Sequence, residues 1–225
     1  MNNKIAVIAA HPDDEVLGCG GAISRFISEG KEVHVLLMTD GVSARDVFDP
    51  GGDVKSRNLA SLNANRLLGT TSVRHLNFPD NQMDSISRLL VIKEIEAFIF
   101  LHKPLIVFTH HCGDVNIDHR VTHDAVIAAC RPQPGFCVKE LYFFEVLSST
   151  EWQTPDYGRV FGPSFFVDVS KHYLSKINAL KEYDHELRSY PHPRSLEAID
   201  AQLKLRGSSV GVDRAEAFVV GRFIL

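Results

Sequence analysis

The sequence has no long apolar run and no excess of basic residues, and each absence excludes a class of protein. Its longest apolar stretch, residues 98–108, is interrupted by Lys103 and Pro104, whereas a membrane span needs about 20 apolar residues in a row. Lysine and arginine number 24 against 28 acidic residues, so the net charge is −4 and no basic footprint for nucleic acid exists. We therefore expect neither a transmembrane nor a nucleic-acid-binding protein.

Paired cysteine motifs are also absent. The four cysteines, at positions 19, 112, 130 and 137, show no CxxC spacing, so a reduced chain explains them better than a disulfide scaffold or a structural zinc site. The short apolar run near the N-terminus is followed at once by charged residues, without a small-residue cleavage site, and we expect no signal peptide. These features together predict a cytoplasmic protein.

What the sequence does contain is an alternation of apolar, β-rich runs with helical patterns. Predicted strands cover residues 5–10, 33–39, 73–78 and 105–110. Predicted helices cover residues 15–29, 54–68 and 86–101, and another begins at residue 122. The continuous apolar character of the strands suits a parallel sheet buried on both faces. We expect a Rossmann-like, open, mostly parallel α/β sheet with helices on both faces.

The pattern changes after Pro132 without a linker long enough to divide the chain. Strands are predicted at residues 138–147, 164–169 and 215–225, and helices at 171–188 and 195–206. We therefore expect one domain, residues 1–225, in which residues 133–225 complete the sheet and cover the pocket. The polar, glycine-containing segment 43–56 is a candidate lid or substrate loop.

Two loops rich in acids and histidines follow the first and fourth predicted strands. The first begins at His11, and the second covers residues 111–120. In a doubly wound sheet these two strands are neighbours where the strand order reverses, and ligands bind in the crevice at their carboxyl ends. We expect the two loops to meet at one site, although about a hundred residues separate them.

The first loop carries His11, Asp13, Asp14 and Glu15 within five residues. Any one of the acids could simply stabilise a helix N-terminus after Pro12. All of them together with an imidazole favour zinc or a similar divalent ion. Successive helical side chains diverge by about 100°, so one aspartate would bind the metal while the other faces a water molecule.

The second loop offers His119 as the natural third ligand, with Asp118 beside it. Three protein ligands with an open position are typical of a catalytic rather than a structural zinc site. The nearby glycines do not form a dinucleotide fingerprint, because the GxGxxG order is absent. Cys19, in an apolar helix, is interpreted as a packing residue.

The run AHPDDEVLGCGG at residues 10–21 closely resembles the signature of the PIG-L/LmbE-type family. Members of this family are zinc-dependent enzymes that remove N-acetyl groups from glucosamine-containing molecules. FPDN (78–81) resembles the family's turn after the third strand, and THHCGDVNIDHR (109–120) resembles its second metal-site segment. EVLSSTEW (145–152), YPHPRS (190–195), RG (206–207) and AEAF (215–218) resemble the bacterial branch of the family, and all these segments occur in the expected order. The resemblance therefore extends along nearly the whole chain.

The resemblance implies one Zn²⁺ per chain, bound by His11, Asp14 and His119, although other divalent ions also suit these donors. It implies that Asp13 is the general base. The activity it implies is hydrolysis of the N-acetyl group of an N-acetylglucosamine-type conjugate, with release of acetate and a free amino sugar. Asp118 is expected to orient an imidazole.

The chain departs from the family at Asn116, where many relatives have a histidine. Asparagine can donate a hydrogen bond but cannot shuttle a proton. Asn116 or Arg57 is then a candidate donor to the developing oxyanion, and Arg57 could equally be a helix surface residue. Protonation of the leaving amine falls to another group, for which the candidates are Asp13 itself, His110, His111 and His192.

Other functions stay open on the sequence alone. They are a metal-dependent amidase for another N-acyl group, a non-catalytic sugar- or nucleotide-binding α/β protein, and a phosphoesterase with two metals, which would want more carboxylates and a phosphate-binding cation. The expected partner is a small molecule or glycan that carries an N-acetyl amino sugar. Its identity (glycan, nucleotide sugar, lipid-linked sugar or natural-product precursor) stays open, as does a homo-oligomeric state.

Overall fold

The computed structural model describes residues 3–44, 53–154 and 159–225, and it is built on one sheet. The strand order is β3-β2-β1-β4-β5-β7-β6. The strands are β1 (Lys4–Ala9), β2 (Glu32–Thr39), β3 (Ser72–Phe78), β4 (Ile106–His110), β5 (Glu140–Phe144), β6 (Phe165–Asp168) and β7 (Ala215–Phe223). β1 to β5 run parallel, and β7 is antiparallel to both β5 and β6. The expected open, mostly parallel α/β sheet is confirmed.

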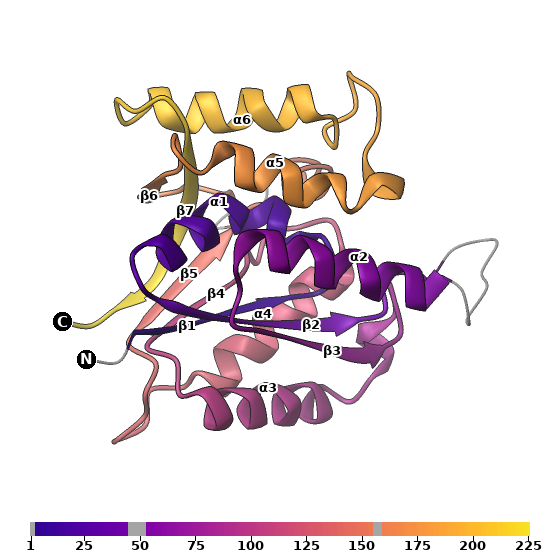
Figure 1. Ribbon diagram of the computed structural model, residues 1–225. Helices are drawn as coiled ribbons and strands as arrows, with labels where there is room; N and C mark the ends of the chain where they lie inside the picture. Colours follow the sequence, from indigo (N-terminus) through magenta and orange to yellow (C-terminus); the bar gives the residue numbers. More distant parts are fainter. Residues whose placement is uncertain (1–2, 45–52, 155–158) are drawn as a thin grey trace.

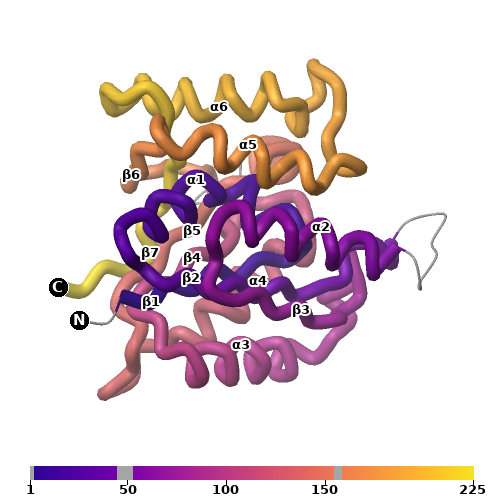
Figure 2. Tube along the Cα trace, viewed as in Figure 1, coloured from indigo at the N-terminus to yellow at the C-terminus, as the bar shows by residue number. Residues whose placement is uncertain are grey.

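Helices cover both faces of the sheet (Figure 1). One side carries α1 (Asp14–Ser28), α2 (Asp53–Leu68), α5 (Tyr173–Lys181) and α6 (Leu196–Ser208). The other side carries α3 (Arg88–His102) and α4 (Ile117–Ala129). Two short 3₁₀ turns, η1 (Met83–Ser85) and η2 (Asp184–Glu186), complete the described elements. The tube in Figure 2 shows α5 and α6 stacked outside α1 and α2, so residues 173–208 add a further layer on that side.

Several predicted boundaries were wrong. The helix predicted at 171–188 ends at Lys181, because the chain turns into η2, and the helix predicted from residue 122 already begins at Ile117. The strand predicted at 138–147 is confined to Glu140–Phe144. Of the predicted loop 43–56, residues 45–52 lie outside the described residues.

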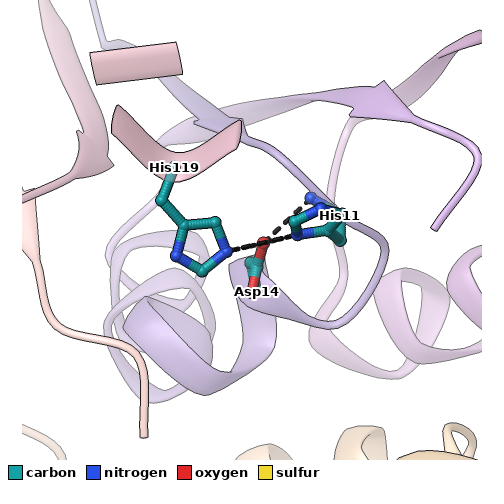
Figure 3. Close-up of side chains that lie close together, drawn as sticks. All are labelled: His11, Asp14 and His119. Atoms are coloured by element: carbon teal, nitrogen blue, oxygen red, sulfur yellow. Dashed lines mark hydrogen bonds and ion pairs between the residues drawn. The ribbon is translucent and has the colours of Figure 1, made fainter. Parts of the chain in front are cut away.

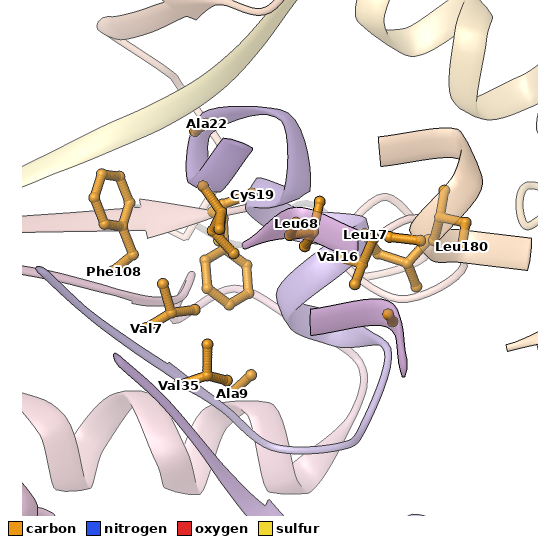
Figure 4. Packing of buried hydrophobic residues seen from close by; sticks show 14 of the residues in the cluster. Val7, Ala9, Val16, Leu17, Cys19, Ala22, Val35, Leu68, Phe108 and Leu180 are labelled. Carbon is orange, nitrogen blue, oxygen red and sulfur yellow. The ribbon is translucent and has the colours of Figure 1, made fainter. Parts of the chain in front are cut away.

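Two hydrophobic cores sandwich the sheet, since alternate side chains of a strand point to opposite faces. Figure 4 shows part of the first core, where strand residues meet helix residues, among them Val7, Val35, Phe108, Leu68 and Leu180. The second core joins the sheet to α3 and α4 and includes Ile8, Leu36, Phe98 and Val126. Burial on both faces explains why the strands are apolar without interruption.

The reversal of strand order lies at β1, which pairs with β2 on one side and β4 on the other. Ile8 of β1 is aligned with Thr109 of β4. The segments that follow β1 and β4 therefore leave the sheet at the same edge, as the sequence predicted.

The helix that follows β1 is kinked. Cys19 has non-helical angles (φ −150°, ψ 23°), which divides α1 into two parts. The buried Glu216 of β7 accepts hydrogen bonds from the N–H groups of Gly21 (2.9 Å) and Ala22 (2.7 Å). It thereby caps the second part of the helix. Lys176 of α5 completes the arrangement, since its Nζ lies 2.6 Å from Glu216 Oε1.

Just before the kink, α1 lies close to the sheet. A Cβ added at Gly18 would lie 2.3 Å from Cδ2 of Phe144, so any other residue there would displace the ring. Lys176 Nζ also donates to the carbonyl of Leu17 (2.7 Å), which helps to satisfy the first part of the helix at its carboxyl end.

Of the helices within residues 3–44, 53–154 and 159–225, each is too short or too polar to cross a membrane.

Removal of one charge from the buried Lys176–Glu216 pair is expected to destabilise the fold. K176M leaves the Glu216 carboxylate without its cation, and such a change costs about 3–5 kcal/mol of unfolding free energy. Urea denaturation followed by circular dichroism measures this. K181M, at an exposed lysine of the same helix, is the control. A loss below about 1 kcal/mol in K176M, typical of exposed ion pairs, would contradict this role.

Candidate active site

Three side chains meet where β1 and β4 end (Figure 3). His11 follows β1, Asp14 is the first residue of α1, and His119 lies in the first turn of α4. Asp14 Oδ2 is 3.0 Å from His11 Nδ1 and 3.1 Å from His119 Nε2, and these two nitrogens are 3.2 Å apart. Exposure is at most 8% for each residue. The sequence predicted this set, and the structure brings it together.

The three donor atoms suit a single metal ion. Ligand atoms around a tetrahedral zinc ion, with bonds of about 2.1 Å, are roughly 3.4 Å apart, which is close to the observed separations. Burial lowers the pKa of His119, but the neighbouring carboxylates of Asp14 and Asp114 outweigh the effect of burial and raise this pKa to about 9. The surroundings therefore favour a cation at this position, and the donors can hold a metal ion.

His11 is oriented by carboxylates on its far side. Its Nε2 lies 3.0 Å from Asp118 Oδ2 and 3.2 Å from Asp80 Oδ1. Burial by itself lowers the pKa of His11. Hydrogen bonds to Asp118, Asp14 and Asp80 outweigh that effect and raise the pKa well above its ordinary value. The expected partnership of Asp118 with an imidazole is thus with His11, whose Nδ1 is left facing Asp14 and His119.

His11, Asp80 and Asp118 also offer donor atoms within 4.8 Å of one another. A second ion there would require His11 to bind metal through both ring nitrogens, hence as an imidazolate. Asp118 is already engaged by the backbone N–H groups of Asn81 (2.6 Å) and Met83 (2.9 Å). We therefore interpret this second set as the support that orients His11.

His119 has an equivalent support. Its Nδ1 lies 3.1 Å from Asp114 Oδ2, and Asp114 in turn accepts hydrogen bonds from the hydroxyls of Ser149 and Thr150. Although burial opposes the charge on Asp114, the hydrogen bond with His119 lowers its pKa to about 2. The Asp114 carboxylate is thus ionised and fixes which nitrogen of His119 faces Asp14.

Asp13, the predicted general base, lies beside this cluster. Its Oδ2 is 2.9 Å from Nη1 of Arg194 and 3.2 Å from Nη2 of Arg57. Its Oδ1 is buried and has no hydrogen-bond partner among the described residues. Burial raises the pKa of Asp13, and the two arginines oppose that rise. One oxygen is thus held in place while the other can receive a proton.

The backbone of Asp13 is also unusual. Its φ of 118° lies in a region that residues other than glycine rarely adopt. The N–H of Asp13 donates to Oε2 of the buried Glu15 (3.0 Å), and Glu15 Oε1 accepts from Asn65 (2.8 Å) and Tyr183 (2.6 Å). Such strain persists only where the surroundings impose it, and it concentrates at functional sites.

A cleft of about 230 Å³ opens over Asp13 and His11. Its other walls include Arg57, Asp80, Asn116, Glu186 and Arg194. Arg57 is buried and lies 2.7 Å from Oε1 of Glu186, so the surface interpretation of Arg57 was wrong. The cleft therefore combines one of the candidate metal ligands, His11, with three carboxylates and two guanidinium groups.

Asn116 has a local structural role as well as a place in the cleft. Its Oδ1 accepts from the N–H groups of Asp118 (2.8 Å) and His119 (3.4 Å) and so caps α4. Its Nδ2 donates to Oδ1 of Asn81 (3.1 Å). Asn116 thus positions the helix that carries His119 while it presents its amide to the cleft.

Among the described residues that line the cleft, none of the three histidines proposed as proton donors is found. His110 is fully buried, accepts from Ala10 N–H through Nε2 (2.8 Å) and stacks on His119. His111 accepts a hydrogen bond from the N–H of Gly113 through Nδ1 (3.0 Å). His192 accepts from Arg194 N–H (3.0 Å). His111 and His192 thus shape the surrounding loops, whereas His110 packs behind the candidate ligands, with its Nε2 3.5 Å from Asp14 Oδ2.

The sequence analysis missed four charged groups at the site. They are Asp80, Asp114, Glu186 and Arg194. Asp80, Asp114 and Arg194 do lie in segments that resemble the family, namely FPDN, THHCGDVNIDHR and YPHPRS, and this was the signal available. Glu186 lies in η2, and no motif marks it.

Comparison with known proteins identifies the class. The family model for PIG-L, GlcNAc-PI de-N-acetylase, matches residues 6–130, more than half of the chain. The uncharacterised deacetylase YaiS of Escherichia coli K12 is 30% identical over 187 residues, which cover 80% of this chain and 89% of YaiS. The chain belongs to the PIG-L family of deacetylases, hydrolases that cleave amide C–N bonds.

Solved structures share the fold. The N,N'-diacetylchitobiose deacetylase of Pyrococcus horikoshii superimposes with a TM-score of 0.80 at 21% identity, covering 98% of this chain and 84% of that one. GalB, the 4-carboxy-2-hydroxymuconate hydratase of Pseudomonas putida, gives 0.79 at 18% identity over 99% and 98% of the two chains. The same fold is thus found in a deacetylase and in a hydratase.

Metal content tests the ligand set. H119A removes one of three donors and is expected to leave the dialysed protein with far less than one ion per chain. D114N keeps His119 but weakens its support, and we expect metal affinity to fall about 10- to 100-fold. Elemental analysis and competition with a chelator measure both.

The control is D124N, an exposed residue of the same helix, which is expected to bind metal normally. If the H119A protein kept the metal content of the unmodified chain, His119 would be removed from the set.

Proposed function

We propose that this chain is a zinc-dependent N-deacetylase that removes the acetyl group from an N-acetylglucosamine-type sugar conjugate and releases acetate and a free amino sugar. The observation that carries the proposal is the buried cluster of His11, Asp14 and His119 beside the partly unpartnered carboxylate of Asp13. Membership of the deacetylase family, and relatives named for acetylated sugars, support the substrate class.

Zinc is the metal that the donors favour. Two imidazole nitrogens and one carboxylate oxygen suit a borderline ion, whereas calcium and magnesium prefer all-oxygen sites. When bound, zinc would supply a Lewis acid and lower the pKa of a coordinated water towards about 7. We assign one ion per chain to His11, Asp14 and His119.

Asp13 would move the proton. Its Oδ1 has no hydrogen-bond partner within the part of the chain that the structure describes, and it can accept a proton from the attacking water within hydrogen-bond reach. Arg57 and Arg194 hold Oδ2, so the carboxylate stays oriented during the transfer. The same oxygen can then return the proton to the departing amine. No proton donor is then needed at position 116, where this chain has asparagine in place of the family's histidine.

Charge that develops on the acetamide oxygen needs donors already in place. The amide of Asn116 and the guanidinium of Arg57 both line the cleft. Preorganised donors of this kind are worth roughly 3–4 kcal/mol each to the transition state. Asn116 Nδ2 carries two N–H groups, so it can donate one to the substrate while the other keeps its hydrogen bond with Asn81.

The fold by itself does not select the reaction, because a hydratase shares it. An amidase that acts on another N-acyl group is the alternative closest in chemistry. A cytoplasmic location, which we also propose, is supported by the four cysteines, all of which are free thiols.

Release of acetate tests the function directly. The zinc-loaded protein is expected to liberate acetate and a primary amine in equal amounts from N-acetylated amino sugars and their glycosides. If zinc-loaded protein released acetate from other N-acyl compounds but from no acetylated sugar, the amidase alternative would replace the proposal.

Substitution of the base separates chemistry from metal binding. D13N keeps the shape of the side chain but removes its ability to accept a proton, and turnover is expected to fall about 10²- to 10⁴-fold. The metal content should stay at one ion per chain, and D124N should match the unmodified enzyme. A loss of metal from D13N would mean that Asp13, rather than Asp14, is the ligand.

A further inference from the structure

We infer that the substrate extends past the acetylated sugar into a second, acid-lined cavity, which accepts an uncharged or ammonium-bearing sugar and rejects a phosphate group. This inference rests on the proposed deacetylase function and narrows its substrate. It selects a glycan over a nucleotide sugar or a phospholipid-linked sugar.

The second cavity adjoins the first. It has a volume of about 470 Å³ and lies between α2 and the segment 182–185. Arg57 lines both cavities and is itself 3.2 Å from the base Asp13. Ligand sites usually measure roughly 300–1,000 Å³, so the 230 Å³ cleft over His11 is small for a whole substrate. The adjoining cavity supplies the missing space.

Its charged lining is acidic. Glu182 and Asp184 are exposed and come from the wall opposite α2. Arg57 does not offset them, because its guanidinium is buried and already lies against Asp13 and Glu186 (2.7 Å). Sites that recognise phosphate use arginine or lysine clusters or backbone N–H groups. A phosphate here would instead meet like charge, which is repulsive even near the surface.

The rest of the lining suits a sugar ring. Ser56 and Asn63 offer hydroxyl and amide groups, and Leu59 and Ala60 offer apolar surface. A sugar presents the same mixture of hydroxyl groups and apolar C–H faces.

Three substrates test the inference on the zinc-loaded enzyme: N-acetylglucosamine, N,N'-diacetylchitobiose and UDP-N-acetylglucosamine. We expect kcat/KM for the disaccharide to exceed that for the nucleotide sugar by at least about tenfold at low salt, where charge repulsion is least screened. E182K/D184K reverses two exposed charges and should shift this ratio about tenfold towards the nucleotide sugar. A ratio of two substrates does not depend on how much of a variant is correctly folded.

Two further variants complete the design. S56W fills the second cavity and should raise KM for the disaccharide several-fold, while the monosaccharide is unaffected. D124K makes the same kind of charge reversal on α4, which covers the other face of the sheet, and it should leave every ratio unchanged. It controls for the net charge of the molecule.

The outcomes separate this inference from the proposed function. If no sugar released acetate, the deacetylase proposal itself would fail. The second cavity would have no such role if N-acetylglucosamine had the same kcat/KM as the disaccharide, or if UDP-N-acetylglucosamine had a higher one. The deacetylase proposal would stand in either case. An unchanged substrate ratio in E182K/D184K would likewise overturn the assignment of the acidic wall.

Discussion

The burial of charged groups at the end of β1 is the constraint on which the rest of the site depends. Asp13 and Asp14 are nearly inaccessible to water, and an ionised carboxylate in that position is costly unless it is paired. Each therefore has cationic or imidazole partners, from Arg57 and Arg194 for the first and from His11 and His119 for the second. The active-site chemistry and the stability of this edge of the sheet thus use the same contacts.

The partners have their own supports, and these come from segments far apart in sequence. Asp118 of α4 holds His11, while Asp114 holds His119 and is itself held by residues 149 and 150. Such outer contacts fix the ring orientation of ligating histidines. A family-like loop without these supports would place similar atoms less rigidly. The site is therefore better described as a network than as a short motif.

The sequence was informative where chemistry and topology are local. Uninterrupted apolar strands predicted the parallel sheet, and the reversal of strand order predicted that His11 and His119 would meet. Arg194 and Glu186 were missed because they lie in irregular segments whose direction is set by the packing of α5 and α6. The kink at Cys19 was equally hidden, since it depends on Glu216, almost two hundred residues away.

The fold does not decide the reaction, because a hydratase and a deacetylase share it. The chemistry proposed for this chain lies in individual residues: the donors at the end of β1, Asp13 with its strained backbone, and asparagine at position 116. Because Asn116 cannot transfer a proton, our proposal assigns protonation of the leaving amine to Asp13. Assignment of an activity within this family thus depends on side chains that a match of backbones does not compare.

The cap that Glu216 provides for α1 has a consequence for the way the protein matures. A ribosome makes the N-terminal half first, and early segments can begin to fold during synthesis. The second part of the helix that begins at Asp14 nevertheless has no cap until Glu216 and its partner Lys176, which follow it in the chain, have been made. Translation that stops short of β7 would leave the helix of the first motif without this cap, so the enzyme acquires its working shape only after β7 has been made.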